Sequence, residues 1–305
     1  MKLSDLGEDR VIAELTKKLP LSTEVKVGVG DDCAVIGTPR DKQWELLKTD
    51  SLIEGVHFTK DADPKRVGWK ALARAISDIA AMGGLPKYAM ITLAVSPEEE
   101  LARVKAIYSG LKQAARRFNV SIVGGETSRS LGGLFLSIAL TGVVPKGECV
   151  LRSGGRVGNA LYVTGRLGGS IRGKHLSFIP RVEEARWLVT NFPPNAMMDL
   201  SDGLGADLPR LARASGVGFE IARESLPLNP GCSPEDALKD GEDFELLFAI
   251  APSKTGTLEK AWKERFPKLP LTRIGQLVAK NGKAADTEAS STNPSNSKYG
   301  FDHFA

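Results

Sequence analysis

The sequence predicts a two-domain α/β protein with mixed sheets. Short apolar runs alternate along the chain with longer segments in which apolar residues recur three and four positions apart, as on one helix face. With 305 residues, the chain is long enough for two domains that each bury a core. Because a turn-rich segment over 145–156 separates two such series, we expect an N-terminal domain over 1–147 and a C-terminal domain over 148–305.

The first half divides into helices and strands in a regular order. One segment carries apolar residues at Val11, Ile12, Leu15 and Leu19, the spacing of one helix face. A glycine pair followed by proline ends a second helix, and a third opens with three glutamates at its positive end. The predicted helices are 10–19, 64–82 and 97–118, and the predicted strands are 25–29, 44–47, 88–95, 120–123 and 134–144.

The second half repeats the alternation after the turn-rich segment. Pro209 lies inside a predicted helix, where proline removes a main-chain donor, so we expect it near the helix start or at a kink. We expect a glycine-rich loop over 165–173, a loose polar loop over 280–298, and an aromatic tail over 299–304 that docks back on the body. The predicted helices are 183–190 and 203–215, and the predicted strands are 160–163, 196–199 and 244–250.

Composition excludes several classes of function. The chain is 42% hydrophobic and 26% charged, as in soluble globular proteins, and no apolar run reaches the ~20 residues of a membrane span. The N-terminus lacks the layout of a signal peptide, and three separated cysteines without metal-type pairing fit a reducing cytoplasm. The basic residues form no dense tract. We therefore expect a cytoplasmic protein without a membrane or nucleic-acid partner.

Acidic residues gather at positions where ligands bind in α/β proteins. Asp32, Asp50 and Asp199 follow apolar runs that predict strands, and Asp78 lies in an apolar helical stretch where an unpaired charge is costly. Mg²⁺ prefers such oxygen ligands together with phosphate oxygens. Two like charges ~4 Å apart repel by about 4 kcal/mol at an effective dielectric of ~20, so gathered aspartates require cations between them. The pattern predicts a magnesium-phosphate site, in a chain whose net charge is +4.

Other interpretations apply to single residues. A turn would explain Asp31 and Asp32 beside Gly30, and a helix N-cap would explain Asp202. His57 alone is typical of a structural histidine. The loop over 165–170 could hold phosphate through main-chain N–H groups, but glycine-rich loops are common. The chain has neither a Walker motif nor a kinase-type GxGxxG.

An ordered set of motifs spans nearly the whole chain and resembles thiamine-monophosphate kinases, within the aminoimidazole-ribonucleotide-synthetase-like superfamily. The GDD and DLSDG elements indicate the superfamily, and the histidine motif with the aromatic tail narrows the resemblance to the kinase. The motifs are Gly28-Val29-Gly30-Asp31-Asp32, Thr49-Asp50, Gly55-Val56-His57-Phe58, Gly68-Trp69-Lys70-Ala71, Ser77-Asp78, Gly124-Gly125-Glu126-Thr127, Leu151-Arg152-Ser153, Asp199-Leu200-Ser201-Asp202-Gly203, Gly241-Glu242-Asp243 and Gly300-Phe301-Asp302-His303-Phe304.

The resemblance implies ATP-dependent phosphorylation of thiamine monophosphate to thiamine diphosphate, by direct in-line transfer with several Mg²⁺ ions. The acceptor is already a phosphate, so catalysis should rest on positioning and charge neutralisation rather than on a general base. The resemblance also implies a two-domain fold of the superfamily and a homodimer joined through N-terminal strands.

The resemblance assigns residues to three groups. The metal ligands would be Asp32, Thr49, Asp50, Asp78, Glu126, Asp199 and Asp202. The ATP contacts would be Tyr108, Gly125, Glu126, Arg152 and Ser201. The contacts to thiamine monophosphate would be His57, Glu242 and Phe301, because an acid and an aromatic face suit a cationic thiazolium.

Several residues depart from the family pattern. Glu126 replaces an aspartate, Gly169 replaces the aspartate of a Gly-Asp-Ser loop, and Asp240 replaces a glycine. Arg172, Lys174 and His175 lie where small apolar residues are expected. Two alternatives therefore stay open: another ATP-dependent enzyme of the superfamily with a different acceptor, or a catalytically silent nucleotide or thiamine-phosphate binding protein. His57 and Phe301 favour the kinase.

Overall fold

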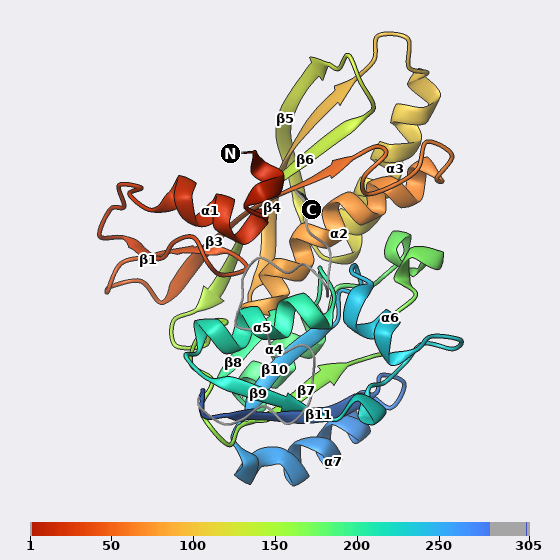
Figure 1. The fold of residues 1–305 in the computed structure, drawn as a ribbon. Helices are drawn as coiled ribbons and strands as arrows, with labels where there is room; N and C mark the ends of the chain where they lie inside the picture. The colour runs from red at the N-terminus through yellow and green to blue at the C-terminus, as the bar shows by residue number, and fades with distance from the viewer. Residues whose placement is uncertain (1, 281–302, 304–305) are drawn as a thin grey trace.

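The computed structural model describes residues 2–280 and 303, and these residues form two β-sheets with helices packed on them. Figure 1 shows the first sheet with its helices in the upper part of the molecule and the second sheet below it. The mixed α/β fold predicted from the sequence is confirmed. The first sheet ends at residue 145 and the second begins at residue 160, while the domain boundary at 147/148 stays a prediction.

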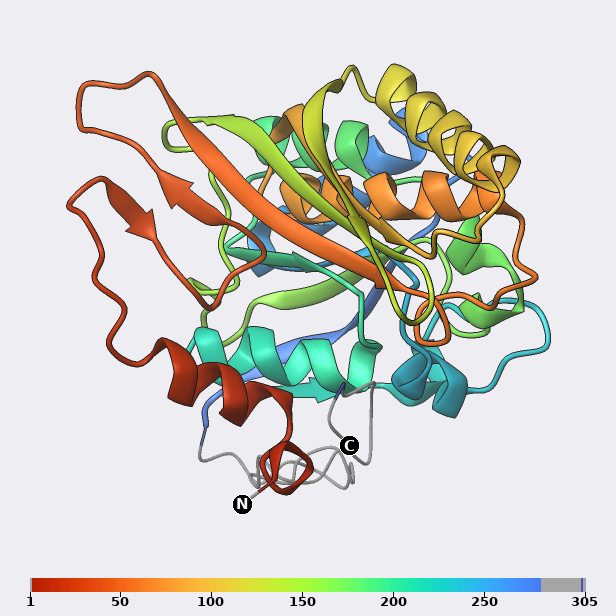
Figure 2. The ribbon, with the colours of Figure 1, turned by 90° about the horizontal axis from the view of Figure 1, so that it is seen from above.

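The first sheet has six strands within the described residues and is covered on one face. Its order is β1 (Val25–Val27), β2 (Ala34–Ile36), β3 (Gln43–Ile53), β6 (Phe135–Pro145), β4 (Leu85–Val95) and β5 (Ser121–Arg129). All neighbours are antiparallel except β4 and β5, which are parallel. Helices α2 (Pro64–Ala81) and α3 (Leu101–Arg117) run side by side across this sheet (Figure 2).

Helix α2 begins and packs as its sequence predicts. Asp63 caps its N-terminus by accepting a hydrogen bond from the Lys65 N–H, and Pro64 occupies the first turn. Gly68 and Gly110 let α2 and α3 approach closely, since a Cβ at either position would overlap the main chain of the other helix. The apolar side of α2 belongs to the first core.

The second sheet has five antiparallel strands in the described part and helices on both faces. Its order is β8 (Ala196–Asp199), β10 (Leu246–Ile250), β7 (Ala160–Thr164), β11 (Leu271–Val278) and β9 (Gly218–Ile221). Alternate residues of β7 explain the two faces: Leu161 and Val163 join the core under α5 (Leu204–Ala214), whereas Ala160 and Tyr162 join the core under α4 (Val182–Asn191) and α7 (Thr255–Arg265). The remaining helices are α1 (Glu8–Thr16) and α6 (Pro234–Lys239).

Helix α2 also faces the second half of the chain, where it contacts α4 and β8. On this side it carries a polar stripe at helical spacing, formed by Lys70, Arg74, Ser77 and Asp78. Lys70, Ser77 and Asp78 are buried, although their side chains are polar. This stripe positions the polar sites described below.

Three predicted elements differ from the structure. The strand predicted over 44–47 continues as β3 to Ile53, so Thr49 and Asp50 lie inside the strand rather than after it. The strand predicted over 120–123 continues through Gly124 and Gly125 to Arg129, because an extended main chain accommodates these glycines at an exposed edge. Helix α3 begins at Leu101, so the three preceding glutamates do not open it.

The other sequence-based expectations have mixed outcomes. Pro209 lies inside α5 as its sixth residue and not near the helix start. The loop over 281–298, Phe301 and most of the aromatic tail lie outside the described residues. His303 is described, and its ring lies 5.4 Å from the ring of His57. Among the described residues, no helix has the length and apolar character needed to cross a membrane.

Candidate active site

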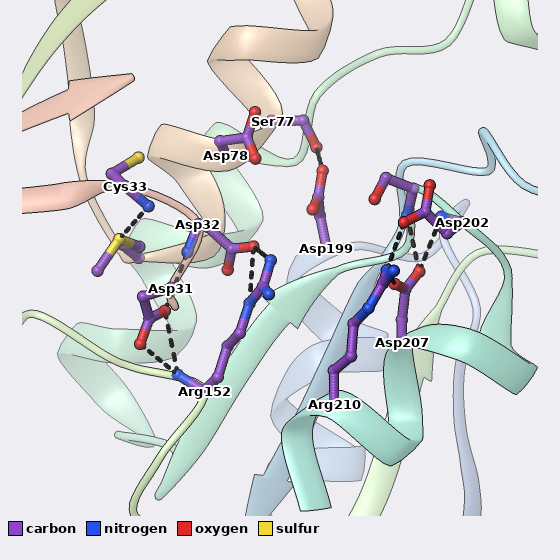
Figure 3. A network of polar contacts seen from close by, with 12 residues as sticks. Asp31, Asp32, Cys33, Ser77, Asp78, Arg152, Asp199, Asp202, Asp207 and Arg210 are labelled. Carbon is purple, nitrogen blue, oxygen red and sulfur yellow. Dashed lines mark hydrogen bonds and ion pairs between the residues drawn. The ribbon is translucent and has the colours of Figure 1, made fainter. Parts of the chain in front are cut away.

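Three buried carboxylates from distant parts of the chain meet between the two sheets. Asp32 comes from the segment before β2, Asp78 from α2 and Asp199 from the end of β8 (Figure 3). One oxygen of each lies within 4.8 Å of the others, and all three side chains are buried. We call these three residues the acid cluster. Three of the candidate magnesium ligands named from the sequence, Asp32, Asp78 and Asp199, thus lie close together.

The neighbours of the acid cluster neutralise only part of its charge. Lys48 Nζ lies 2.7 Å from Asp78 Oδ1, Arg152 Nε donates to Asp32 Oδ1 at 3.2 Å, and Ser77 Oγ donates to Asp199 at 2.5 Å. Burial, with the neighbouring Asp32 charge, raises the pKa of Asp199 to about 7. Burial also raises the pKa of Asp78, against the attraction of Lys48.

The second carboxylate oxygen of Asp32, Oδ2, is buried and lacks a hydrogen-bond partner among the described residues. Such an atom carries the full desolvation cost of a carboxylate oxygen unless a cation or a donor meets it. An orphaned oxygen within a group of three carboxylates fits a hard divalent cation such as Mg²⁺, which binds through oxygen ligands.

Asp31 organises the segment that brings Arg152 to the cluster. Both of its carboxylate oxygens accept from the Arg152 main-chain N–H, at 3.1 and 3.2 Å. Burial and the adjacent Asp32 raise the pKa of Asp31 to about 7. The sequence shows Asp31 only as the neighbour of Asp32. The fold shows that Asp31 binds the main chain of Arg152, a predicted ATP contact.

A second acidic group surrounds the start of α5. Asp207 Oδ2 accepts from the N–H groups of Ser201 and Asp202 at 3.0 and 2.9 Å, and Arg210 pairs with both carboxylates. The N-cap of α5 is Gly203, so the N-cap interpretation of Asp202 is wrong. We did not predict Asp207, yet it is an aspartate within the apolar stripe of a helix, the same signal that selected Asp78.

Other predicted metal ligands lie outside the acid cluster. Asp50 pairs with Arg74 of α2 at 3.1 Å. Since successive strand residues point to opposite faces, Thr49 faces the uncovered side of the first sheet, where its Oγ1 lies 3.5 Å from Ser137 Oγ. Glu126 is exposed on the edge strand β5. Asp202 pairs with Arg210, as described above. The structure therefore does not bring these residues into the group of three carboxylates.

The predicted ATP contacts come from separate elements. Tyr108 of α3 packs on the first core, and Gly125 lies where a Cβ would overlap the Ile91 carbonyl of the neighbouring strand. The Ser201 carbonyl accepts from the Glu242 N–H at 2.6 Å, which links the ATP and acceptor groups expected from the resemblance. Arg152 lies beside the acid cluster.

The two described acceptor contacts meet around a lysine that the sequence analysis did not assign. Lys70 Nζ lies 2.6 Å from Glu242 Oε2, 2.7 Å from the His57 carbonyl and 2.8 Å from His175 Nδ1. We call Lys70, His175 and Glu242 the lysine centre. Burial lowers the pKa of Lys70 to about 8, with the Glu242 charge acting against this shift.

His57 is a buried histidine with one ring nitrogen bound to the main chain. Its Nδ1 accepts from the Ile53 N–H at 3.0 Å, which supports part of the structural interpretation. Burial and the charge of Arg74 lower the pKa of His57 to about 4, so the ring is neutral at pH 7. With Nδ1 acting as an acceptor, the proton of the neutral ring is on Nε2.

Two departures from the family pattern face each other in the second half. The Gly169 N–H donates to Asp240 Oδ2 at 2.7 Å. Gly169 has a φ of +70°, and a Cβ there would crowd Cys232 Sγ, so a side chain is disfavoured at this position. The Asp240 carboxylate thus reaches the loop in which residue 169 carries no carboxylate.

Comparison with known proteins defines the class of this fold and site. Residues 30–144 match the family model "AIR synthase related protein, N-terminal domain", and residues 167–287 match its C-terminal counterpart. The hydrogenase maturation protein HypE of E. coli is 21% identical, with a TM-score of 0.66 over 77% of this chain and 80% of that chain. At this identity the likeness shows the fold alone.

More similar relatives identify the family. A thiamine-monophosphate kinase of Rhodopirellula baltica is 38% identical over 88% of this chain and 87% of its own length. A structure described as AaThiL complexed with AMPPCP and TMP is 34% identical, covers 99% of both chains and has a TM-score of 0.82. The chain belongs to the thiamine-monophosphate kinase family.

Proposed function

We propose that this chain transfers the γ-phosphoryl group of ATP to thiamine monophosphate and so forms thiamine diphosphate. The acid cluster is the observation that carries this proposal, because it supplies three carboxylates and one orphaned oxygen at the junction of the two sheets. The related structure of AaThiL was described with AMPPCP and TMP, which supports the choice of donor and acceptor.

Asp32, Asp78 and Asp199 would hold Mg²⁺, which neutralises phosphate charge when it is bound. Further Mg²⁺ ions would use the other predicted ligands, Thr49, Asp50, Glu126 and Asp202. This requires bound phosphates or a conformational change that brings these residues close to the ions. Lys48 and Arg152 already place positive charge beside the acid cluster. The acceptor phosphate needs no general base, so positioning and charge neutralisation would account for the rate.

We assign donor and acceptor contacts by the same proposal. Arg152 suits a bidentate contact with an ATP phosphate, and Tyr108, Gly125 and Ser201 would complete the donor site. His57 and Glu242 would contact thiamine monophosphate, Glu242 by charge and His57 through its ring. These assignments rest on the resemblance and on the junction that the structure describes.

Phe301 would complete the acceptor site, although it lies outside the described residues. Its neighbour in the aromatic tail, His303, lies next to the ring of His57, which supports this assignment. Phe301→Ala should weaken binding of thiamine monophosphate and leave ATP binding unchanged, because only the acceptor would use its ring. Calorimetry with each ligand measures both affinities, and unchanged acceptor affinity would contradict the assignment.

We propose that two copies of the chain associate through the uncovered face of the first sheet. Helices α2 and α3 cover one face, while Tyr88, Met90 and Val123 are 55%, 53% and 59% exposed on strands β4 and β5. Exposed large apolar side chains on a sheet face favour a protein partner. Sedimentation analysis of the chain and of Met90→Asp tests this proposal, which a wild-type monomer at micromolar concentration would contradict.

The proposed reaction has a direct test. The full chain is incubated with ATP and thiamine monophosphate in Mg²⁺, and separately in EDTA, and thiamine diphosphate is followed by chromatography. We expect product only with Mg²⁺. If ATP binds but no product forms, the chain has a different acceptor or is a silent binding protein, for which the departures Glu126 and Gly169 would be the reason.

The location of the protein stays a prediction. Cys33, Cys149 and Cys232 are free thiols, which fits the cytoplasm expected from the sequence. The proposed use of ATP as a co-substrate agrees with that compartment.

A further inference from the structure

Lys70 is the most completely buried cation of the described residues. Its side chain has 0% exposure, and it lies in the N-terminal part of α2 on the side facing the second half of the chain. A lysine in this environment is costly unless all of its charge and its donors are satisfied. A fully buried lysine therefore requires an explanation beyond the packing of α2.

The ammonium of Lys70 is surrounded by polar atoms of the protein. It has three N–H donors, and three polar atoms lie within 2.8 Å: the His57 carbonyl, Glu242 Oε2 and His175 Nδ1, which itself lies 3.0 Å from Glu242 Oε2. His57 belongs to the first half of the chain, whereas His175 and Glu242 belong to the second. One ammonium thus connects three segments that converge only in the folded protein.

Two of these three partners are the acceptor contacts proposed above. Lys70 binds the main chain of His57 and not its imidazole. It binds one oxygen of Glu242, which leaves the other oxygen for a ligand. The same lysine therefore sets the distance between two groups that would contact one substrate from opposite halves of the chain.

Glu242 has a main-chain conformation that needs such support. Its φ is +64°, in a region that residues other than glycine rarely occupy because it is strained. The Glu242 N–H donates to the Ser201 carbonyl at 2.6 Å, and Lys70 holds the carboxylate at the other end of the residue. Strain that persists at a site of this kind is a sign of function when the surroundings enforce it.

We propose that Lys70 is a positioning residue for the acceptor, which fixes Glu242 and His57 relative to each other, with His175 as a further contact of the Lys70–Glu242 pair. This inference deepens the proposed function and rests on it. The ammonium contacts Glu242 and the main chain of His57, the two proposed acceptor contacts, so its loss should change acceptor recognition more than donor recognition.

Lys70→Met tests the proposal because it keeps the length of the side chain and removes the charge and donors. We expect the KM for thiamine monophosphate to rise by about 10- to 100-fold, the range for losing a hydrogen bond to a charged group, while the KM for ATP changes little. An equal loss for both substrates, or a fall in kcat alone, would overturn the proposal.

A double-mutant cycle separates positioning from general stability. If Lys70 acts through Glu242, the KM of Lys70→Met,Glu242→Gln for thiamine monophosphate should be close to that of Glu242→Gln alone. Independent effects that multiply would show that Lys70 does not act through this carboxylate.

A milder variant and a matched control cover the case in which Lys70→Met fails to fold. His175→Leu removes the contacts of His175 Nδ1 with Lys70 and with Glu242 and keeps the Lys70–Glu242 pair, so it should raise the same KM by about 2- to 10-fold. Trp69→Phe removes the hydrogen bond from Trp69 Nε1 to the Phe178 carbonyl, which also joins α2 to the second half. It should lower thermal stability without changing the KM for thiamine monophosphate.

The outcomes distinguish this inference from the proposed function. If the wild-type chain makes no thiamine diphosphate, the proposed function fails first. If the wild-type chain is active and Trp69→Phe raises the acceptor KM as much as His175→Leu does, the junction is only structural, and the role of Lys70 is wrong.

Discussion

The acid cluster and the lysine centre each include one residue of the polar stripe of α2, Asp78 and Lys70. The two groups differ in how their charges are balanced. Around the acid cluster, buried carboxylates gather from three elements and Asp32 Oδ2 has no partner in the described structure. Around the lysine centre, one buried ammonium meets one carboxylate, one main-chain carbonyl and His175 Nδ1. The first group has an excess of negative charge, whereas in the second the charges of Lys70 and Glu242 balance each other.

This difference separates a site that needs an external cation from a site that does not. Burial alone would raise the pKa of Glu242, but its contacts with His175 and Lys70 lower the pKa to about 2. The pKa of Asp199 is instead raised to about 7, by burial and by Asp32. Glu242, which pairs with a cation of the protein, stays ionised and would position a ligand. The carboxylates of the acid cluster, which lack enough cations of the protein, would bind a metal ion.

The largest expected effect comes from breaking the acid cluster. Asp78→Asn should lower turnover by about 10²–10³-fold or more, because it removes a carboxylate that would hold charge at the reacting phosphates, and the fold should be kept. Turnover is measured by thiamine diphosphate formation, and folding by circular dichroism. Asp61→Asn, at an exposed position, is the matched control. Activity of Asp78→Asn close to wild type would remove Asp78 from the metal site.

A smaller effect should follow from filling the acid cluster. Mg²⁺ should stabilise the wild-type chain, by about 2.7 kcal/mol when its concentration is 100 times the dissociation constant, since it binds the folded state. Asp199→Asn should lose most of this stabilisation. Thermal unfolding with and without Mg²⁺ gives the difference. Glu242→Gln is the comparison from the lysine centre and should keep the full response to Mg²⁺; equal losses in both variants would contradict the distinction between the two sites.

A third prediction concerns Asp243, a buried carboxylate outside the acid cluster that also has an orphaned oxygen. Asp243 Oδ1 is buried without a hydrogen bond in the described structure, but Lys174 Nζ lies 3.7 Å away. Burial raises the pKa of Asp243 to about 7, despite the opposing charge of Lys174. The folded state therefore holds this proton up to a higher pH than the unfolded state does.

The sign of the pH dependence follows from that difference. Between pH ~4 and ~7 the folded chain binds more protons at Asp243 than the unfolded chain, so the free energy of unfolding falls as pH rises, by at most about 1.4 kcal/mol per pH unit. Asp243→Asn keeps the acceptor for the Gly168 N–H and should make the slope less steep in urea unfolding at pH 5 to 8, while Asp31 and Asp199 keep their contributions. Glu264→Gln, at an exposed position, should keep the wild-type slope. A slope unchanged in Asp243→Asn would mean that the carboxyl is ionised throughout.

Several elements could be predicted from the sequence because their signals are local. The helix predicted over 64–82 is observed as α2, and the glycine pair that indicated its end, Gly83 and Gly84, follows it. The strand predicted over 196–199 is β8. The strands around Thr49 and Gly125 were predicted too short, since polar residues and glycines break an apolar pattern although hydrogen bonds to neighbouring strands continue.

The sequence by itself determined the mixed α/β fold, the family and the aspartates at the ends or within apolar segments. Only the tertiary structure decided that Asp32, Asp78 and Asp199 meet, that Thr49 and Glu126 lie elsewhere, and that Lys70 pairs with Glu242. The physical reason is that charge balance depends on distances between side chains far apart in the chain. Those distances are set by the packing of α2 against both sheets, and no local pattern of residues encodes them.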